Sequence, residues 1–209
     1  AFEQWRIRNR MDSGFKLQTQ HSYAAILRRN PEFFAAHPET LIGPPGENTK
    51  LDPSHPILLE MLARDAIEQF RRNPLWDCIS CDPSDGGGWR KDSPLGSASN
   101  QALTVSNHVA RAIQAEFPGR RVGMYAYSEH SPPPDLQVDP HVIVSVATNF
   151  LRQGNTVEGL LAAWHAKGAE MGIREYLGVW PWDHDLPGRS RAARLDDIAR
   201  SLPHYHSLG

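Results

Sequence analysis

The 209-residue sequence has few cysteines, little net charge and no long apolar run. Its two cysteines, Cys78 and Cys81, are three residues apart in a predicted strand, where side chains alternate between faces, so a disulfide between them is disfavoured. A single C-x-x-C without a second pair is not a zinc-site pattern, and we therefore predict buried thiols. The formal net charge of -2 provides no basic field for nucleic acid. No apolar stretch approaches the roughly 20 residues of a membrane span, so we expect no membrane partner.

The composition is that of a globular domain, with 40% hydrophobic and 22% charged residues. A chain of this length can bury a sizeable core, and we interpret residues 1–209 as one domain or part of one. The sequence starts at Ala1 and has no visible signal peptide. We therefore expect a mature or excised segment.

Hydrophobic periodicity predicts helices that alternate with strands. The firmest helix has apolar residues at helical spacing from Leu58 to Phe70, with Asp52 or Ser54 as its cap and Asn73-Pro74 as its end. Thr156 is predicted to cap a later helix. The other helices are expected over 24–29, 32–37, 101–117, 156–167 and around 195–202. Strands are expected over 15–19, 77–81, 122–127, 142–147 and 173–179.

This alternation, with strands that are mostly apolar on both faces, predicts a parallel α/β fold. An open doubly wound sheet and a (β/α)₈ TIM-type barrel are the two alternatives. The open sheet would usually carry G-x-G-x-x-G before a helix, whereas Gly86-Gly87-Gly88 is followed by Trp89 and a further loop. About five strands are present, so a barrel would lie only partly in this chain. We prefer the barrel because reactive residues follow several strands.

The most informative stretch runs from Trp76 to Trp89. It begins as a buried strand and ends in Asp82, Asp85 and three glycines, so it brings two carboxylates to a loop where a substrate can approach closely. Other predicted strands end in the same way. The residues concerned are His21, Glu129, His130, Asn149, Glu175 and Asp183. A barrel would place all of these strand ends on one rim.

Several motifs together resemble an uncharacterised bacterial family, a domain of unknown function. They are His21-Ser22-Tyr23, Asn30-Pro31-Glu32-Phe33-Phe34, His37-Pro38-Glu39, Pro83-Ser84-Asp85-Gly86-Gly87-Gly88, Asn107-His108-Val109-Ala110 and Tyr125-Ala126-Tyr127 with Pro132-Pro133. Members look like glycosidase barrels distantly similar to α-glucuronidases and β-hexosaminidases, often within large secreted proteins. The resemblance covers roughly residues 5–180. One departure is Trp89-Arg90-Lys91, where the family often has cysteines.

The resemblance implies a (β/α)₈ catalytic domain, usually preceded by a small α/β domain. The missing barrel strands and that N-terminal domain would lie in the parent protein, and an extracytoplasmic location is suggested. No cofactor is expected. Arg90, Lys91 or Arg174 can meet the carboxylate of an acidic sugar.

Glycoside hydrolysis needs a proton donor and a second carboxylate as nucleophile or base. We predict Asp85, Glu129 and Glu175 as the catalytic candidates, with Asp85 as acid or polariser. Glu129 can instead be a solvated loop residue, and Glu175 can pair with an arginine in a structural role. The predicted substrate-binding residues are His21, Tyr23, Trp89, Tyr125, Tyr127, His130, Tyr176, Trp180, Trp182 and Asp183.

The leading hypothesis is a glycoside hydrolase that acts on an oligo- or polysaccharide, and sugars bearing uronic acid or N-acetyl groups are candidate substrates. A carbohydrate-binding barrel without catalysis is the first alternative. A metal-dependent hydrolase using His21, His130, Asp183 and His184 is the second, but no metal-ligand spacing such as H-E-x-x-H supports it. The absence of a G-x-S-x-G turn disfavours a Ser-His-Asp hydrolase.

Overall fold

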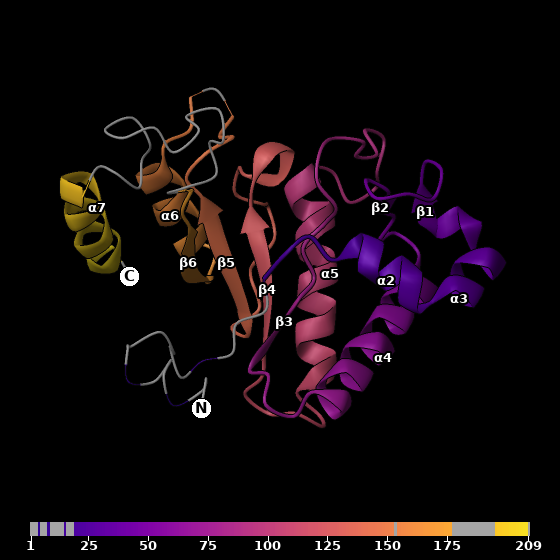
Figure 1. The fold of residues 1–209 in the computed structure, drawn as a ribbon. Helices are drawn as coiled ribbons and strands as arrows, with labels where there is room; N and C mark the ends of the chain where they lie inside the picture. Colours follow the sequence, from indigo (N-terminus) through magenta and orange to yellow (C-terminus); the bar gives the residue numbers. More distant parts are fainter. Residues whose placement is uncertain are drawn as a thin grey trace.

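The computed structural model describes Gln4, Arg8, Phe15 and residues 19–152, 154–176 and 195–208. A four-stranded parallel sheet forms its centre (Figure 1). The strands are β3 (Cys78–Ser80), β4 (Arg121–Ala126), β5 (Val142–Ala147) and β6 (Glu170–Arg174). They are paired in the order β3-β4-β5-β6, so neighbours in the sheet are also neighbours along the chain.

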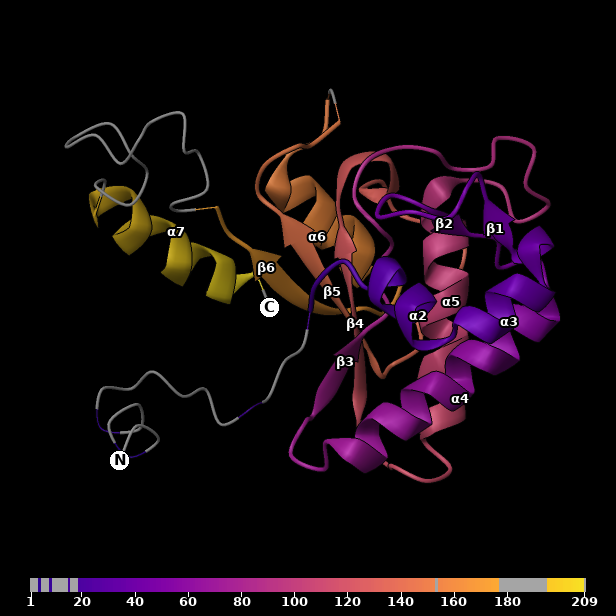
Figure 2. The same cartoon turned by 45° about the vertical axis from the view of Figure 1, so that its right-hand side comes forward.

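Helices supply the crossovers that a parallel sheet requires. The helix α5 (Ala98–Ile113) lies between β3 and β4 in the chain, and α6 (Val157–His165) lies between β5 and β6. Before β3 comes α4 (Pro56–Arg72), which lies beside α5 in both views (Figures 1 and 2). A loop with the short 3₁₀-helix η2 (Ser128–His130) follows β4.

The remaining elements are short or terminal. The helices α2 (Tyr23–Arg29) and α3 (Pro31–Ala36) and the 3₁₀-helix η1 (Pro38–Thr40) precede a small antiparallel pair of strands. That pair is β1 (Leu41–Ile42) and β2 (Lys50–Leu51), which flank the Gly43–Asn48 loop. The last described helix is α7 (Leu195–Ser207). No helix in the described part of the chain is long and apolar enough to cross a membrane.

One face of the sheet packs against the helices to form the core. Alternate residues of each strand belong to it, as expected from the two-residue repeat of a strand. They include Ile79, Cys81, Val122, Met124, Ala126, Val142, Val144 and Val146. From α4 the core receives Leu58, Leu62, Ala66 and Phe70, spaced by four along one face of the helix.

The other face of the sheet carries small residues at several positions. Gly123, Ser145 and Gly172 lie on it, and a Cβ at Gly172 would be only 2.7 Å from the Ser145 hydroxyl. A Cβ at Gly123 would overlap the methyl group of Thr19, so glycine is needed for the N-terminal segment to lie against β4. The Tyr125 hydroxyl donates to the Thr19 carbonyl at 2.7 Å, and His21 forms a parallel bridge with Asp82.

Most predicted elements are confirmed, with some corrections. The run 142–147 is β5 as predicted, Thr156 caps α6, and both cysteines are buried. The strand expected over 173–179 was wrong in position, because β6 begins at Glu170 and ends at Arg174, and residues 177–194 lie outside the description. The expected cap of α4 was also wrong. His55 is the N-cap residue and makes no side-chain cap, while Asp52 accepts hydrogen bonds from Ser54 and Arg90.

Gly123→Ala tests the close approach of the N-terminal segment to the sheet. The added methyl group would overlap Thr19 and lie 3.3 Å from the Cys78 sulfur, so the free energy of unfolding should fall by about 1–3 kcal/mol. Urea denaturation measures this loss. Gly46→Ala is the control, because its Cβ would be 3.9 Å from the nearest atom, the Thr49 hydroxyl. Equal stability of the two variants would contradict the close approach.

Candidate functional site

The carboxyl ends of the four parallel strands bring polar and aromatic residues to one edge of the sheet. The segments after the strands are 81–89, 127–131, 148–152 and 175–176, and His21 joins them through its bridge to Asp82. Parallel strands end on the same side, which is why residues far apart in the sequence meet here. We call this set of residues the carboxyl-edge site.

Asp82 is the buried centre of the carboxyl-edge site. One carboxylate oxygen lies 2.7 Å from His21 Nδ1, and the other accepts from the Tyr125 amide at 2.7 Å. Its main-chain carbonyl accepts from the Ser22 amide and hydroxyl, both at 2.9 Å. Burial raises the pKa of Asp82, but the neighbouring His130 and His21 outweigh burial, and the pKa falls below its usual value. Asp82 therefore connects three separate segments.

His21 is held in one orientation by this carboxylate. Its Nδ1 lies 2.7 Å from both Asp82 and the Pro83 carbonyl, so Nδ1 must carry a proton to serve these two acceptors. The other ring nitrogen, Nε2, lies 3.9 Å from the Asp85 carboxylate. Burial lowers the pKa of His21, yet the hydrogen bond and charge of Asp82, with smaller effects from Pro83 and Asp85, raise it above the usual value.

Two of the predicted catalytic carboxylates lie close to the same glycine loop. The Asp85 side chain is 58% exposed. A Cβ on Gly87, two residues further on, would lie 3.2 Å from the Glu129 carboxylate. Glu129 in turn lies 3.5 Å from the Arg152 guanidinium. The segment after β3 therefore carries Asp85 and, two residues later, the glycine against which Glu129 from the segment after β4 lies.

Tyr127 is the phenol that interacts with Asp85. Burial raises the pKa of Tyr127 well above its usual value, and the hydrogen bond to Asp85 and the charge of that carboxylate raise it further. The ring of Tyr127 also lies 5.6 Å from the His21 ring, centroid to centroid. Asp85 therefore has a phenol and an imidazole as neighbours.

The glycine loop is held from beneath by Lys50, a fully buried lysine of β2. Its ammonium group donates to the carbonyls of Ser84 at 2.6 Å and Asp85 at 2.8 Å, and lies 5.7 Å from the centroid of the Trp89 ring. Burial lowers the pKa of Lys50, while the charges of Asp85, Asp82 and Glu129 oppose that effect. Lys50 fixes the backbone that carries Asp85.

Glu175 reaches the same edge from β6. One of its carboxylate oxygens accepts from the Thr148 hydroxyl and from the Tyr176 amide, both at 2.7 Å. The Arg174 guanidinium lies over the rings of Tyr176, at 5.4 Å, and Tyr125, at 6.0 Å. Glu175 therefore connects the ends of β5 and β6.

Several predicted binding residues are buried, and their expected contact with substrate needs correction. Tyr23 has no exposed surface, because it packs in the core. Trp89 is 8% exposed, since its loop folds back over Lys50 and His130. Tyr125 and His130 are also buried, between the N-terminal segment and the strand ends. The rings of these four residues are therefore covered by other parts of the protein and are not available to stack on a sugar.

The other predicted residues divide into three groups. His21, Tyr127 and Tyr176 keep exposed surface at the edge. Trp180, Trp182 and Asp183 lie outside the described residues. Arg90 does not suit the expected contact with an acidic sugar, because it pairs with Asp52 at 2.7 Å and Asp92 at 3.2 Å.

Sequence reasoning missed two important residues. Asp82 was placed at the strand end but not among the site residues, although its position directly after a buried strand was the available signal. Lys50 gave no signal, because it lies 34 residues before Ser84 in a two-residue strand. In the described ranges, no three His, Cys, Asp or Glu side chains are grouped so as to hold a metal ion.

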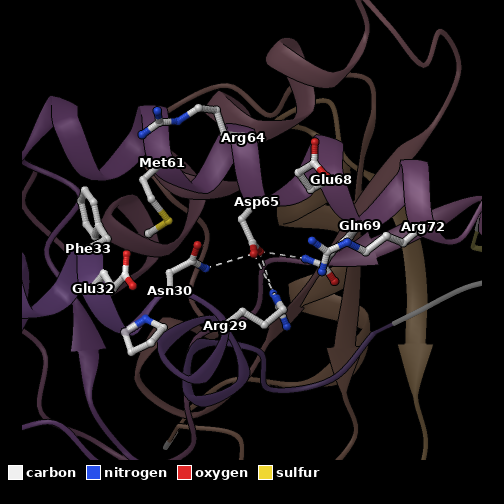
Figure 3. A pocket seen from close by; sticks show the side chains of 11 residues that line it. Arg29, Asn30, Glu32, Phe33, Met61, Arg64, Asp65, Glu68, Gln69 and Arg72 are labelled. Atoms are coloured by element: carbon white, nitrogen blue, oxygen red, sulfur yellow. Dashed lines mark hydrogen bonds and ion pairs between the residues drawn. The ribbon is translucent and has the colours of Figure 1, made fainter.

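A separate cavity of about 600 Å³ lies where α2 and α3 meet α4 (Figure 3). At its centre the Asp65 carboxylate accepts hydrogen bonds from Arg29, Asn30 and Gln69 at 2.7–3.0 Å. These polar groups satisfy one another across the helix junction. The cavity is lined by no residue of the carboxyl-edge site.

Comparison with known families gives a match over residues 2–167 to a family described as "Domain of unknown function (DUF4838)". The chain belongs to the DUF4838 family. No curated protein and no solved structure matches it. The expected membership of a family of unknown function is thereby confirmed. The glycosidase likeness is no part of this match and stays a prediction.

Lys50→Met tests how the glycine loop of this DUF4838 domain is held. The variant leaves the buried carbonyl of Ser84 and the part-buried carbonyl of Asp85 without the Lys50 donor, so the free energy of unfolding should fall by about 1–3 kcal/mol. Chemical denaturation measures the change, with the exposed Lys91→Met as control. A Lys50→Met protein as stable as the control would contradict the role given to Lys50.

His21→Gln tests the pairing of His21 with Asp82 through its pH dependence. A raised folded-state pKa gives stability that is present below the unfolded pKa and lost as the pH rises through the folded pKa. The stability difference between wild type and variant should therefore be larger at about pH 5.5 than at about pH 8.5. Urea denaturation at both pH values measures it.

His108→Gln is the matched control, because burial lowers the pKa of His108 and the nearby Glu60 opposes this only in part. A lowered histidine pKa reverses the sign, so for His108 the difference should be smaller at the acid pH. A His21 difference that does not change with pH would refute the pairing.

Proposed function

We propose that this DUF4838 domain is a glycoside hydrolase built on part of a (β/α)₈ barrel, with an oligo- or polysaccharide as its substrate. The order of the strands supports the barrel. The segment ending at His21 and then β3, β4, β5 and β6 are parallel and follow one another in chain order. A doubly wound sheet would reverse its direction at a switch point, whereas a barrel continues in one direction.

The two faces of the sheet agree with the barrel proposal. Helices cover one face, as in the outer ring of a barrel. The other face carries Gly123, Ser145 and Gly172, and Gly123 leaves room for Thr19 of the N-terminal segment on what would be the barrel interior. The remaining strands would come from elsewhere in the parent protein.

The observation that carries the proposed reaction is the meeting of Asp85 and Glu129 at one glycine loop. Glycosidases use two carboxylates that flank the scissile bond, and these come from the ends of different strands in a barrel. Asp85 and Glu129 follow β3 and β4, and the Glu129 carboxylate lies against Gly87. The lack of a Cβ at Gly87 lets the Glu129 carboxylate lie directly against the loop that carries Asp85.

Specific neighbours give Asp85 a defined direction. The Tyr127 phenol is one neighbour of the Asp85 carboxylate. The other is His21, whose Nε2 lies 3.9 Å from that carboxylate and whose ring is held by Asp82. Such supporting contacts are the usual means by which a reactive carboxylate is positioned. We therefore assign Asp85 and Glu129 as the catalytic pair. Glu175, which is bonded to Thr148 and to the Tyr176 amide, supports the rim.

The carboxyl-edge site has an exposed cation that could bind an acidic sugar. Arg174 is exposed and lies over two tyrosine rings, which keep its planar guanidinium at the edge. Arginine binds carboxylates through two parallel hydrogen bonds. Arg174 therefore takes the role that Arg90, paired with Asp52, does not suit.

Asp85→Asn and Glu129→Gln test the catalytic pair. Each should lower kcat by about a thousandfold or more, because the lost carboxylate serves only the transition state, while sugar binding persists. The measurement is release of reducing sugar from a panel of plant, bacterial and animal polysaccharides by the full-length protein. Glu47→Gln, an exposed residue paired with Arg28, is the control.

Three outcomes separate the possibilities. Loss of turnover in both variants with retained binding supports the hydrolase. Wild-type rates in both variants would contradict the assignment of Asp85 and Glu129. Binding of a saccharide by the wild type without any turnover would favour the carbohydrate-binding barrel.

A further inference from the structure

Phe150 combines two features that are uncommon in one residue. Its backbone has a φ of +59°, and its bulky side chain is 46% exposed. A positive φ is strained for a bulky residue, and such strain persists only where the surroundings impose it. Hydrophobic burial does not account for this conformation, since the ring is half in solvent.

The strain occurs at the carboxyl-edge site. Within the described ranges, the non-glycine residues with positive φ are Ser128 and Phe150. Ser128 follows β4 and directly precedes Glu129, and Phe150 follows β5. Both strained positions thus shape the strand ends that surround the proposed catalytic pair.

Neighbouring side chains hold the Phe150 ring at this edge. Its centroid lies 5.7 Å from that of Tyr127 and 5.7 Å from that of Tyr176, with interplanar angles of 70° and 71°. Such edge-to-face contacts fix a ring without covering both of its faces. Tyr127 is also the neighbour of Asp85, and Arg152, two residues after Phe150, pairs with Glu129. The Phe150 loop is therefore connected to both proposed catalytic carboxylates.

We propose that Phe150 is a stacking platform for one pyranose ring of the saccharide, in a subsite beside Asp85 and Glu129. This inference rests on the proposed function and adds a subsite to it. The C–H face of a pyranose is apolar while its hydroxyl groups point outward, so an exposed aromatic face can bury the former and leave the latter hydrated. Phe150 takes the role that sequence analysis gave to Trp89 and Tyr125, which are buried.

Saccharide affinity in the full-length protein tests this subsite. The probes are cellotriose, xylotriose, chitotriose and trigalacturonic acid, titrated by isothermal calorimetry. For the probe that binds the wild type most tightly, Phe150→Ala should raise Kd about tenfold, because the stacking contact is lost. Phe150→Tyr and Phe150→Trp keep a flat ring and should stay within about threefold of the wild type.

Two further variants separate stacking from a structural role. Leu75→Ala, at a 79% exposed leucine just before β3, should leave Kd and Tm unchanged. Phe150→Gly relieves the positive φ, so its Tm should be at or above that of Phe150→Ala while its Kd remains raised. A Tm in both Phe150 variants far below that of Leu75→Ala would show that the ring packs as part of the core and would overturn the subsite.

The remaining outcomes are also decisive. If the wild type binds a probe and Phe150→Ala binds it equally well, the subsite is refuted while the proposed hydrolase stands. If the wild type binds none of the four probes, both the subsite and the proposed function for these sugars are refuted. A tenfold rise in Kd with an unchanged Tm supports the subsite.

Discussion

The carboxyl-edge site depends on one buried carboxylate. Asp82 accepts hydrogen bonds from the His21 ring and from the Tyr125 amide, while its main chain accepts from Ser22. A buried carboxylate is stable only when such partners compensate for its lost hydration. The same contacts therefore offset the cost of burying the Asp82 carboxylate. They also join the N-terminal segment to the end of β3 and to β4. Together with the Pro83 carbonyl, Asp82 holds Nδ1 of His21 so that Nε2 lies toward Asp85.

Around this centre the chain combines rigid support with local strain. Lys50 holds the carbonyls of the glycine loop from below, so that Asp85 is exposed on a fixed backbone. Ser128 and Phe150 adopt positive φ angles in the segments that follow β4 and β5. A native fold departs from its local preferences mainly where function requires a particular geometry. Fixed support and strain at one edge are the arrangement expected of a binding or catalytic site.

Sequence reasoning recovers those parts of this structure that local patterns determine. The β-branched run of β5 and the four-residue apolar spacing of α4 depend only on neighbouring residues. Parallel topology brings strand ends to one edge, which is why the segments with Asp85, Glu129 and Glu175 are predicted to share it. Their catalytic role stays a prediction. Contacts between segments that are distant in the sequence cannot be predicted from such local patterns. Lys50 binds a loop 34 residues later, and Trp89 is buried only because that loop folds back.

The central claim is that the ends of the parallel strands form one saccharide site organised by Asp82. A crystal structure of the full-length protein with a bound oligosaccharide tests it most directly. We expect a sugar ring over Phe150, with its glycosidic oxygen between Asp85 and Glu129 and with His21 still bonded to Asp82. A saccharide bound elsewhere, or a carboxyl edge covered by another part of the protein, would contradict the account.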